Sequence, residues 1–234
     1  MARMGIVLAS LAVTSLLIGA APLTDVGDVT ISPVSREVDS GTVAYSGVRP
    51  RFTGIGDAAA QKRLNAQMAE WEKEALERTR AAAVTMLADD RSEQRKAEGV
   101  FSYEVKRNSG GLVSLLFSEY LYAGGANGLE TKTGLTFFTD SGEALTLPGL
   151  FTNSEDGLQR VNALVAAELK KRKLESELLI ANPHVEANQP FYLTDTDLVI
   201  VVPEVTWFPH SMGAVELSIP LTQFRNYLRP ELQP

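Results

Sequence analysis

The sequence predicts an α+β protein in which antiparallel sheets carry one long helix and one medium helix on their faces. Three observations predict this class: short segments of alternating apolar and polar residues, glycine-rich turns between them, and two segments with helical spacing of apolar residues. Their order is a strand and a helix, three strands, a second helix, and then three or four strands. We therefore expect two interdependent halves of similar plan.

The centre of the chain is expected to be a meander of three antiparallel strands, at residues 99–107, 112–122 and 129–139. Asn108-Ser109-Gly110-Gly111 is a strong turn signal between the first two strands. A second turn, Gly124–Gly128, joins the last two, and its three glycines permit backbone angles with positive φ. Because this turn joins two strands, a structural hairpin is favoured over a phosphate-binding loop.

A long helix is expected to begin after Asp57, which is a good N-cap residue. Its apolar residues recur at steps of three, four or seven and share one face, which indicates packing against a sheet. They are Leu64, Met68, Trp71, Ala75, Ala82 and Met86. The preceding segment, residues 42–52, alternates as a strand, and Pro50 restricts it to a sheet edge or a strand end.

The second half begins with a helix after residues 153–156, whose apolar face is formed by Leu158, Val161, Val165 and Leu169. Strands at 191–193 and 198–202 form a hairpin, and the last strand spans 214–219. Leu198–Val202 is apolar throughout, so we expect a central strand buried on both faces. Pro220 opens a short terminal helix.

The N-terminus predicts export. Arg3 precedes an apolar run, Ile6–Ala21, that no charge interrupts, so residues 1–21 are expected to be a signal peptide or a short membrane anchor. Either alternative places the protein outside the cytoplasmic membrane, secreted or anchored, with membrane contact only through residues 6–21 if they are not cleaved. Residues 22–40 are expected to be a tether or a loosely attached strand. Residues 41–118 then form a small N-terminal α+β domain and residues 119–234 a C-terminal one.

Composition excludes several functions. The formal net charge is −7, which argues against nucleic acid as a partner and favours a cationic protein. The chain has no cysteine, so disulfides, thiolate metal sites and a cysteine nucleophile are excluded. Its two histidines, His184 and His210, lack the spacing of metal ligands, and we expect no metal and no cofactor.

Catalytic constellations are weak in this sequence. His210, Ser211 and Glu204 could be drawn as a triad, but no serine has the G-x-S-x-G context of a nucleophile elbow. Paired carboxylates could still hydrolyse or modify a cell-wall glycan, and this enzyme remains the alternative to a binding protein. The candidate carboxylates are Asp195, Asp197, Glu204 and Glu216.

Residues 120–128 read YLYAGGANG, which resembles the signature Y-x-Y-x-G-G-A-H-G of a bacterial extracytoplasmic sensor-domain family. Residues 139–151, TDSGEALTLPGLF, and residues 191–194 with 198–203 and 212–221 fit the same family. This RsiV-like family includes the lysozyme-binding region of the sigma-V anti-sigma factor, and such domains also precede a peptidoglycan deacetylase. Asn127 replaces the histidine of the motif, so a role that needs an imidazole does not carry over.

The resemblance implies a non-enzymatic binding or sensing module for a lysozyme-like protein or a cell-wall glycan. The turn at residues 207–213 carries several large apolar side chains. They either plug one end of the core or, if exposed, form a second candidate surface that anchors a partner. The residues that we expect to bind are Tyr120, Tyr122, Gly124, Gly125, Asn127, Trp207, Phe208, His210 and Met212.

Overall fold

A computed structural model describes residues 29–88 and 95–233 and confirms the α+β class, with one long and one medium helix. The first half contains β1 (Thr30–Asp39), β2 (Val43–Thr53), α1 (Ala58–Ala88), β3 (Ala97–Ser109), β4 (Leu112–Tyr122), β5 (Leu129–Phe138) and β6 (Ala144–Leu145). The second half contains α2 (Ser154–Lys171), β7 (Phe191–Leu193), β8 (Asp197–Val202) and β9 (Val215–Pro220).

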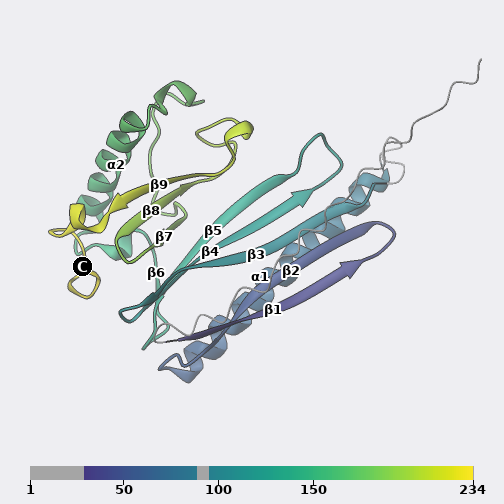
Figure 1. Ribbon diagram of the computed structural model, residues 1–234, viewed down its shortest axis with the longest axis horizontal. Coiled ribbons are helices and arrows are strands. Elements are labelled where there is room, and N and C mark those ends of the chain that lie inside the picture. Colours follow the sequence, from purple (N-terminus) through teal and green to yellow (C-terminus); the bar gives the residue numbers. More distant parts are fainter. Residues whose placement is uncertain (1–28, 89–94, 234) are drawn as a thin grey trace, which may run out of the picture.

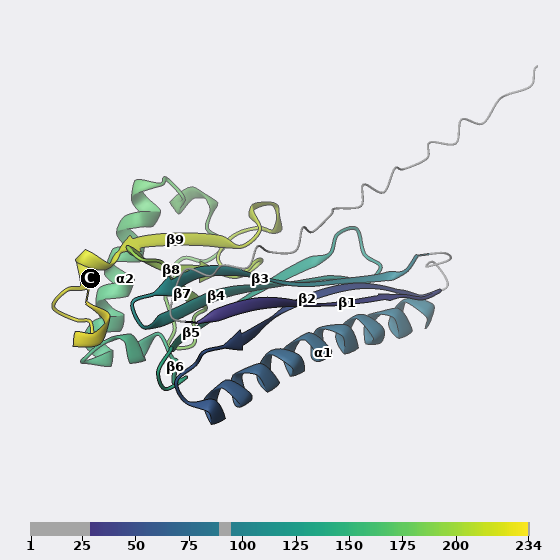
Figure 2. The same cartoon turned by 60° about the horizontal axis from the view of Figure 1, so that its bottom comes forward.

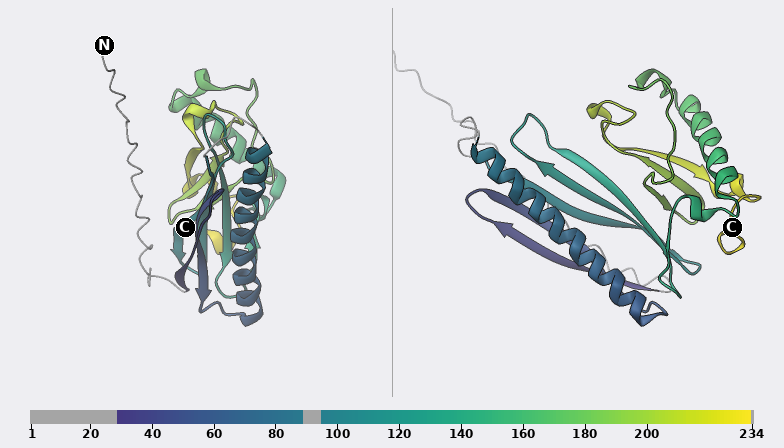
Figure 3. Two further views of the ribbon diagram at one scale, coloured as in Figure 1. Left: turned by 90° about the vertical axis from the view of Figure 1, so that its right-hand side faces the viewer. Right: turned by 180° about the vertical axis from the view of Figure 1, so that it is seen from behind.

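These elements form two sheets that pack face to face (Figures 1 and 2). The larger sheet has the order β1-β2-β3-β4-β5-β6, and the smaller one has the order β7-β8-β9. Helix α1 lies along one face of the larger sheet, and the smaller sheet lies on the opposite face (Figure 2). Helix α2 covers the outer side of the smaller sheet, as the view from behind also shows (Figure 3).

The predicted meander is confirmed, since β3 pairs with β4 and β4 with β5, both antiparallel. Gly110 and Gly111 have φ of 58° and 74° and make the first turn, as their sequence signal predicted. In the second turn only Gly124 uses the positive φ that its three glycines permit, with a value of 92°. Gly128 is needed for space instead, because a Cβ atom there would lie 2.3 Å from the Tyr120 ring.

Helix α1 begins as predicted. Asp57 is its N-cap, and its Oδ1 atom accepts hydrogen bonds from the N–H groups of Ala59 and Ala60 at 2.8 and 3.2 Å. The predicted apolar face packs on the sheet, where the Trp71 ring meets Phe117 edge to face at 5.2 Å between centroids. The helix connects β2 to β3, which pair in parallel.

Two expected boundaries differ from the structure. Of the two alternatives for residues 22–40, a tether or a loosely attached strand, residues 30–39 form the strand: β1 pairs with β2 along its whole length and buries Ile31 in the core, so it is attached more firmly than expected. The boundary expected between residues 118 and 119 falls inside β4, and the larger sheet continues to β6. Alternation within one strand carries no signal for the end of a sheet, which explains this difference.

Pro50 lies where its chemistry allows, because the pairing of β2 with β3 ends at Gly47 and Pro50 faces only β1.

The leader predicted at residues 1–21 lies outside the described residues. Within the described part of the chain, no helix has the length and apolarity needed to cross a bilayer.

The second half follows the predicted plan. Strand β8 is central and its apolar run is buried on both faces. Leu198, Ile200 and Val202 face the core beneath α2, together with Val161, Val165 and Leu169 of that helix. Val199 and Val201 face the larger sheet, where they form a small layer with Leu116 and Tyr192. The terminal helix after Pro220 is a short 3-10 segment, Leu221–Phe224.

Candidate functional site

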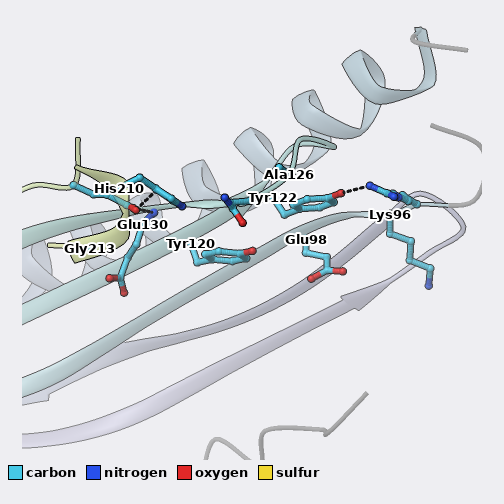
Figure 4. A pocket seen from close by; sticks show the side chains of 12 residues that line it. Lys96, Glu98, Tyr120, Tyr122, Ala126, Glu130, His210 and Gly213 are labelled. Carbon is cyan, nitrogen blue, oxygen red and sulfur yellow. Dashed lines mark hydrogen bonds and ion pairs between the residues drawn. The ribbon is translucent and has the colours of Figure 1, made fainter. Parts of the chain in front are cut away.

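An open pocket of about 870 Å³ lies at the end of the larger sheet, beside the β4–β5 turn (Figure 4). Its floor consists of Tyr120 and Tyr122 on β4, Glu98 on β3 and Glu130 on β5. Arg95 and Lys96 close one end. The segment between β8 and β9 contributes Glu204, His210 and Gly213, and the turn contributes Ala126, Asn127 and Gly128.

The floor follows from strand alternation. Residues two apart on a strand share a face, so Tyr120 and Tyr122 both point away from the α1 side, where Phe117 packs. Strand register places Glu98 opposite Tyr122 and Glu130 opposite Tyr120. The two rings lie in line along the strand, with their hydroxyls pointing toward the Lys96 end (Figure 4). Each tyrosine thus offers an apolar ring and a polar tip to a ligand.

Arg95 fixes one end of this floor, because its Nη1 donates a hydrogen bond to the Tyr122 hydroxyl at 3.0 Å. Lys96 forms an ion pair with Asp39 at the end of β1. Two cationic side chains therefore stand at one end of the pocket, and the carboxylates of Glu98 and Glu130 stand along its floor.

Glu204 attaches the β8–β9 segment to the sheet. Its side chain is only 6% exposed, and Oε2 accepts a hydrogen bond from the Glu130 backbone N–H at 2.9 Å. The other oxygen, Oε1, pairs with Nδ1 of His210, whose side chain is 43% exposed. The next residue, Val205, has a φ of 58°, a strained conformation for a β-branched side chain. Val205 thus marks a tight turn directly after Glu204, and the hydrogen bond from Glu130 attaches Glu204 to the edge of β5.

The structure brings together four of the residues expected to bind: Tyr120, Tyr122, Asn127 and His210. Gly124 lies outside the pocket, where a Cβ atom would be 2.9 Å from Cγ of Met86. Gly125 lines a separate hollow on the α1 side of the sheet. Met212 is half-buried against the core of the second half.

The interpretation of the Trp207 turn as an exposed anchor was wrong. Trp207 is 6% exposed and Phe208 is 1% exposed, and both belong to the core beneath α2. The alternative, in which these residues plug the core, holds. Burial of two large aromatic side chains is strongly favourable, and here it also anchors the segment that carries Glu204 and His210.

Sequence reasoning missed Arg95, Lys96, Glu98 and Glu130 as pocket residues. Alternation within β3 and within β5 shows which residues of that strand share a face with Glu98 or Glu130, but it does not link them to the tyrosines of β4. The register that sets them opposite Tyr122 and Tyr120 depends on pairing between strands, and Arg95 precedes β3 without any motif.

The candidate carboxylates of the enzyme alternative do not converge. Asp195 accepts a hydrogen bond from Ser109, and Glu216 accepts one from the Tyr192 hydroxyl at 2.7 Å. Asp197 is bonded within its own turn by Thr196. Of the four, only Glu204 lines the pocket. Over residues 29–88 and 95–233, no group of three or more His, Cys, Asp or Glu side chains is placed to hold a metal ion.

The fold and the pocket define a class: a two-sheet α+β protein with an open polar and aromatic site where the two halves meet. Comparisons with known proteins then divide the chain in two. Residues 37–130 match the family model described as deacetylase PdaC. Residues 149–222 match the model described as a protein of unknown function, DUF3298. A search of the curated proteins gave no match.

Solved structures share the fold across both halves. A DUF3298 family member from Bacteroides fragilis is 18% identical, with a TM-score of 0.66 over 87% of this chain and 94% of its own. A DUF3298 family protein from Pseudomonas aeruginosa is also 18% identical, with a TM-score of 0.63 over 91% of this chain and 99% of its own. The chain therefore shares the fold of these two DUF3298 structures, and an identity of 18% supports likeness of fold alone.

Proposed function

We propose that this protein is a non-enzymatic, extracytoplasmic binding module that holds part of its ligand in the Tyr120–Tyr122 pocket. The observation that supports the proposal best is the pocket floor, where two aligned rings alternate with carboxylates and end at two cations. A site with a few placed polar groups around aromatic surface is typical of recognition. Its wide opening suits a ligand that is larger than the pocket.

Two envelope ligands fit this chemistry, a lysozyme-like protein and a cell-wall glycan. The acidic net charge would attract a cationic protein, and the tyrosine rings offer stacking surface to a sugar. The resemblance of the YLYAGGANG segment to an envelope sensor domain supports an extracytoplasmic location. The apolar run before residue 22 supports export.

Calorimetric titration of the purified chain with lysozyme, and separately with soluble peptidoglycan fragments, tests this proposal. We expect one of them to bind, and the double variant Tyr120→Ala/Tyr122→Ala to weaken that binding by about tenfold or more. Tyr120→Phe/Tyr122→Phe keeps the rings and separates stacking from hydroxyl contacts. Asp195→Asn, outside the pocket, is the matched control. Failure of both ligands to bind, or equal binding by the double alanine variant, would refute the proposal.

The second candidate function is a carboxylate-dependent enzyme acting on cell-wall glycan. The observation that favours it is the buried Glu204 carboxylate beside His210 at the pocket wall. An assay of peptidoglycan solubilisation separates the two functions. The binding module should show no activity above a protein-free control, whereas activity that disappears in Glu204→Gln and persists in Asp195→Asn would establish the enzyme.

A further inference from the structure

We propose that the outer edge of β5, from Thr131 to Leu135, accepts an extended basic segment of a partner protein as an additional strand. This inference concerns the backbone edge of the sheet, not the tyrosine pocket, and it is independent of the ligand proposed above.

The edge is open between Glu130, whose N–H is bonded to Glu204, and Thr136, where pairing with β6 begins. On the pocket side, the backbone of Phe191 lies against Gly134, where a Cβ atom would be 1.7 Å from the Phe191 carbonyl oxygen. β5 pairs with β4 over all ten of its residues, whereas β6 pairs only with Thr136 and Phe137. Within the described residues, no strand pairs with the outer side of residues 129–135. In an antiparallel pair, alternate residues direct N–H and C=O to opposite sides. The N–H groups of Glu130 and Phe138 bond outward, to Glu204 and Glu143, so the groups of Lys132 and Gly134 point outward too.

The two edges of the larger sheet differ in how they are protected. Natural edges are blunted by proline and by exposed charges, because an unpaired backbone recruits other strands. The opposite edge strand, β1, contains Pro33 and the exposed charges Arg36 and Glu37. Lys132 does not protect β5, since its side chain is only 14% exposed and lies against Ser118 and Glu130. The β5 edge therefore remains available.

Hollows lie on both faces beside this edge, as side chains of an added strand would require. Helix α1 packs on β2, β3 and β4 and leaves the face of β5 largely uncovered. Two hollows of about 790 and 220 Å³ lie there, lined in part by Leu129, Thr131 and Thr133. Leu129 is 49% exposed. The tyrosine pocket lies on the other face, so alternate side chains of a docked strand would meet apolar surface and polar surface in turn.

The charges beside the edge select a basic segment. The carboxylates of Glu74 and Glu119 stand on the α1 side with a single guanidinium, Arg78. Arg78 is already held by Glu119 through two hydrogen bonds of 2.6 and 2.7 Å. Glu130 and Glu204 stand on the other side, where Lys132 lies 3.7 Å from Glu130 and His210 pairs with Glu204. Four carboxylates therefore stand along the edge against two permanent cations, Arg78 and Lys132, and a lysine- or arginine-containing strand complements the excess negative charge.

The test uses a defined probe, a seven-residue peptide that alternates valine with lysine, and its glutamate counterpart. Amide hydrogen exchange of the full chain is followed with and without each peptide. We expect the lysine peptide to slow exchange at the amides of Lys132 and Gly134. The amides of Thr131 and Thr133 already face β4 and serve as internal controls with unchanged exchange. The glutamate peptide should leave all four unchanged.

Two variants identify the binding surface. Lys132→Pro removes an outward N–H without removing a bond to β4, and Thr133→Lys places a cation in the hollow beside α1. Each should weaken binding of the lysine peptide by about tenfold, whereas Thr85→Lys, on an exposed part of α1, should not. Tyr120→Ala/Tyr122→Ala should retain the backbone protection, which separates this site from the pocket.

The assignment is overturned if the wild-type chain does not bind the lysine peptide, or binds it without protection at Lys132 and Gly134. Equal binding of the glutamate peptide would overturn the basic partner. A concentration-dependent dimer that Lys132→Pro dissolves would make a second copy of this chain the occupant, and it too would overturn the assignment. If Lys132→Pro fails to fold, the comparison of Thr133→Lys with Thr85→Lys decides.

Discussion

At the residue scale, several glycines are needed for close contact and not for an unusual backbone angle. The strongest case between helix and sheet is Gly99 on β3, because a Cβ atom there would lie 2.0 Å from Oγ1 of Thr79 on α1. Thr79 is fully buried and donates to the Ala75 carbonyl at 3.0 Å, so it cannot turn away without losing that bond. The contact sets how closely α1 approaches the sheet.

Gly99→Ala should therefore lower the free energy of unfolding by about 1–3 kcal/mol, measured by urea denaturation. Thr79→Ala removes the atom that clashes, so the double variant should recover part of the loss. Gly41→Ala is the control, because nothing lies within 4 Å of a Cβ atom at that position and its φ is ordinary. Equal effects of the Gly99 and Gly41 substitutions would contradict the packing account.

Alkaline pH should destabilise the protein through Tyr192. Burial, and then its hydrogen bond to Glu216, raises the pKa of this hydroxyl above its usual value near 10. The native state then holds a proton that the unfolded chain releases. The stabilisation is therefore complete below about pH 10 and is lost as pH rises further. Between pH 8 and 11, urea denaturation should show a smaller decline in the free energy of unfolding for Tyr192→Phe than for the wild type. An equal decline would refute the role of Tyr192.

At the scale of elements, local signals predicted most of the structure. The Asp57 cap, the Asn108–Gly111 turn and the apolar run of β8 each act within a few residues, so the sequence displays them directly. Pairing between segments that are distant in the sequence leaves no local pattern of this kind. The parallel contact between β2 and β3 spans the whole of α1, and β1 is held by β2 and not by any pattern of its own.

The attachment of β1 to α1 can be tested at one ion pair. Arg36 on β1 reaches Glu72 on α1, with 3.2 Å between Nε and Oε1, and Glu72 is 2% exposed. Arg36→Ala should lower the free energy of unfolding by about 1–2 kcal/mol, because it leaves a buried carboxylate without its cation, while the exposed half of Arg36 limits the loss. Adding Glu72→Gln should reduce the loss in denaturation measurements. An unchanged midpoint in Arg36→Ala would show that β1 does not depend on the pair.

At the scale of the whole molecule, the two halves meet at apolar contacts, at hydrogen bonds such as that from the Leu193 N–H to Ser114, and at the pocket. Leu116 of the larger sheet packs against Tyr192, Val199 and Val201 of the smaller one. The pocket draws Tyr120 from one half and His210 from the other. The motif residues could be selected from the sequence, but their meeting depends on how two sheets pack, which no local pattern encodes.

The two tryptophans can show whether the two halves unfold together, since Trp71 lies on α1 in the first half and Trp207 lies in the second half. In Trp71→Phe and Trp207→Phe, the remaining fluorophore should follow the same unfolding curve, because the halves unfold together. Leu116→Ala should cost about 2–4 kcal/mol and separate the two curves. Curves that already differ in the unsubstituted background would show that the halves are independent.

The parallel pairing of β2 with β3 also bears on the order in which the sheet forms during synthesis. When β1, β2 and α1 have emerged from the ribosome, β3, β4 and β5 have not yet emerged. Helix α1 can then bury its apolar face against only part of the sheet that covers it in the native state. Contacts between segments far apart in sequence close slowly. The segment from β1 to α1 should consequently stay unfolded, and accessible to chaperones, until β3, β4 and β5 have emerged from the ribosome.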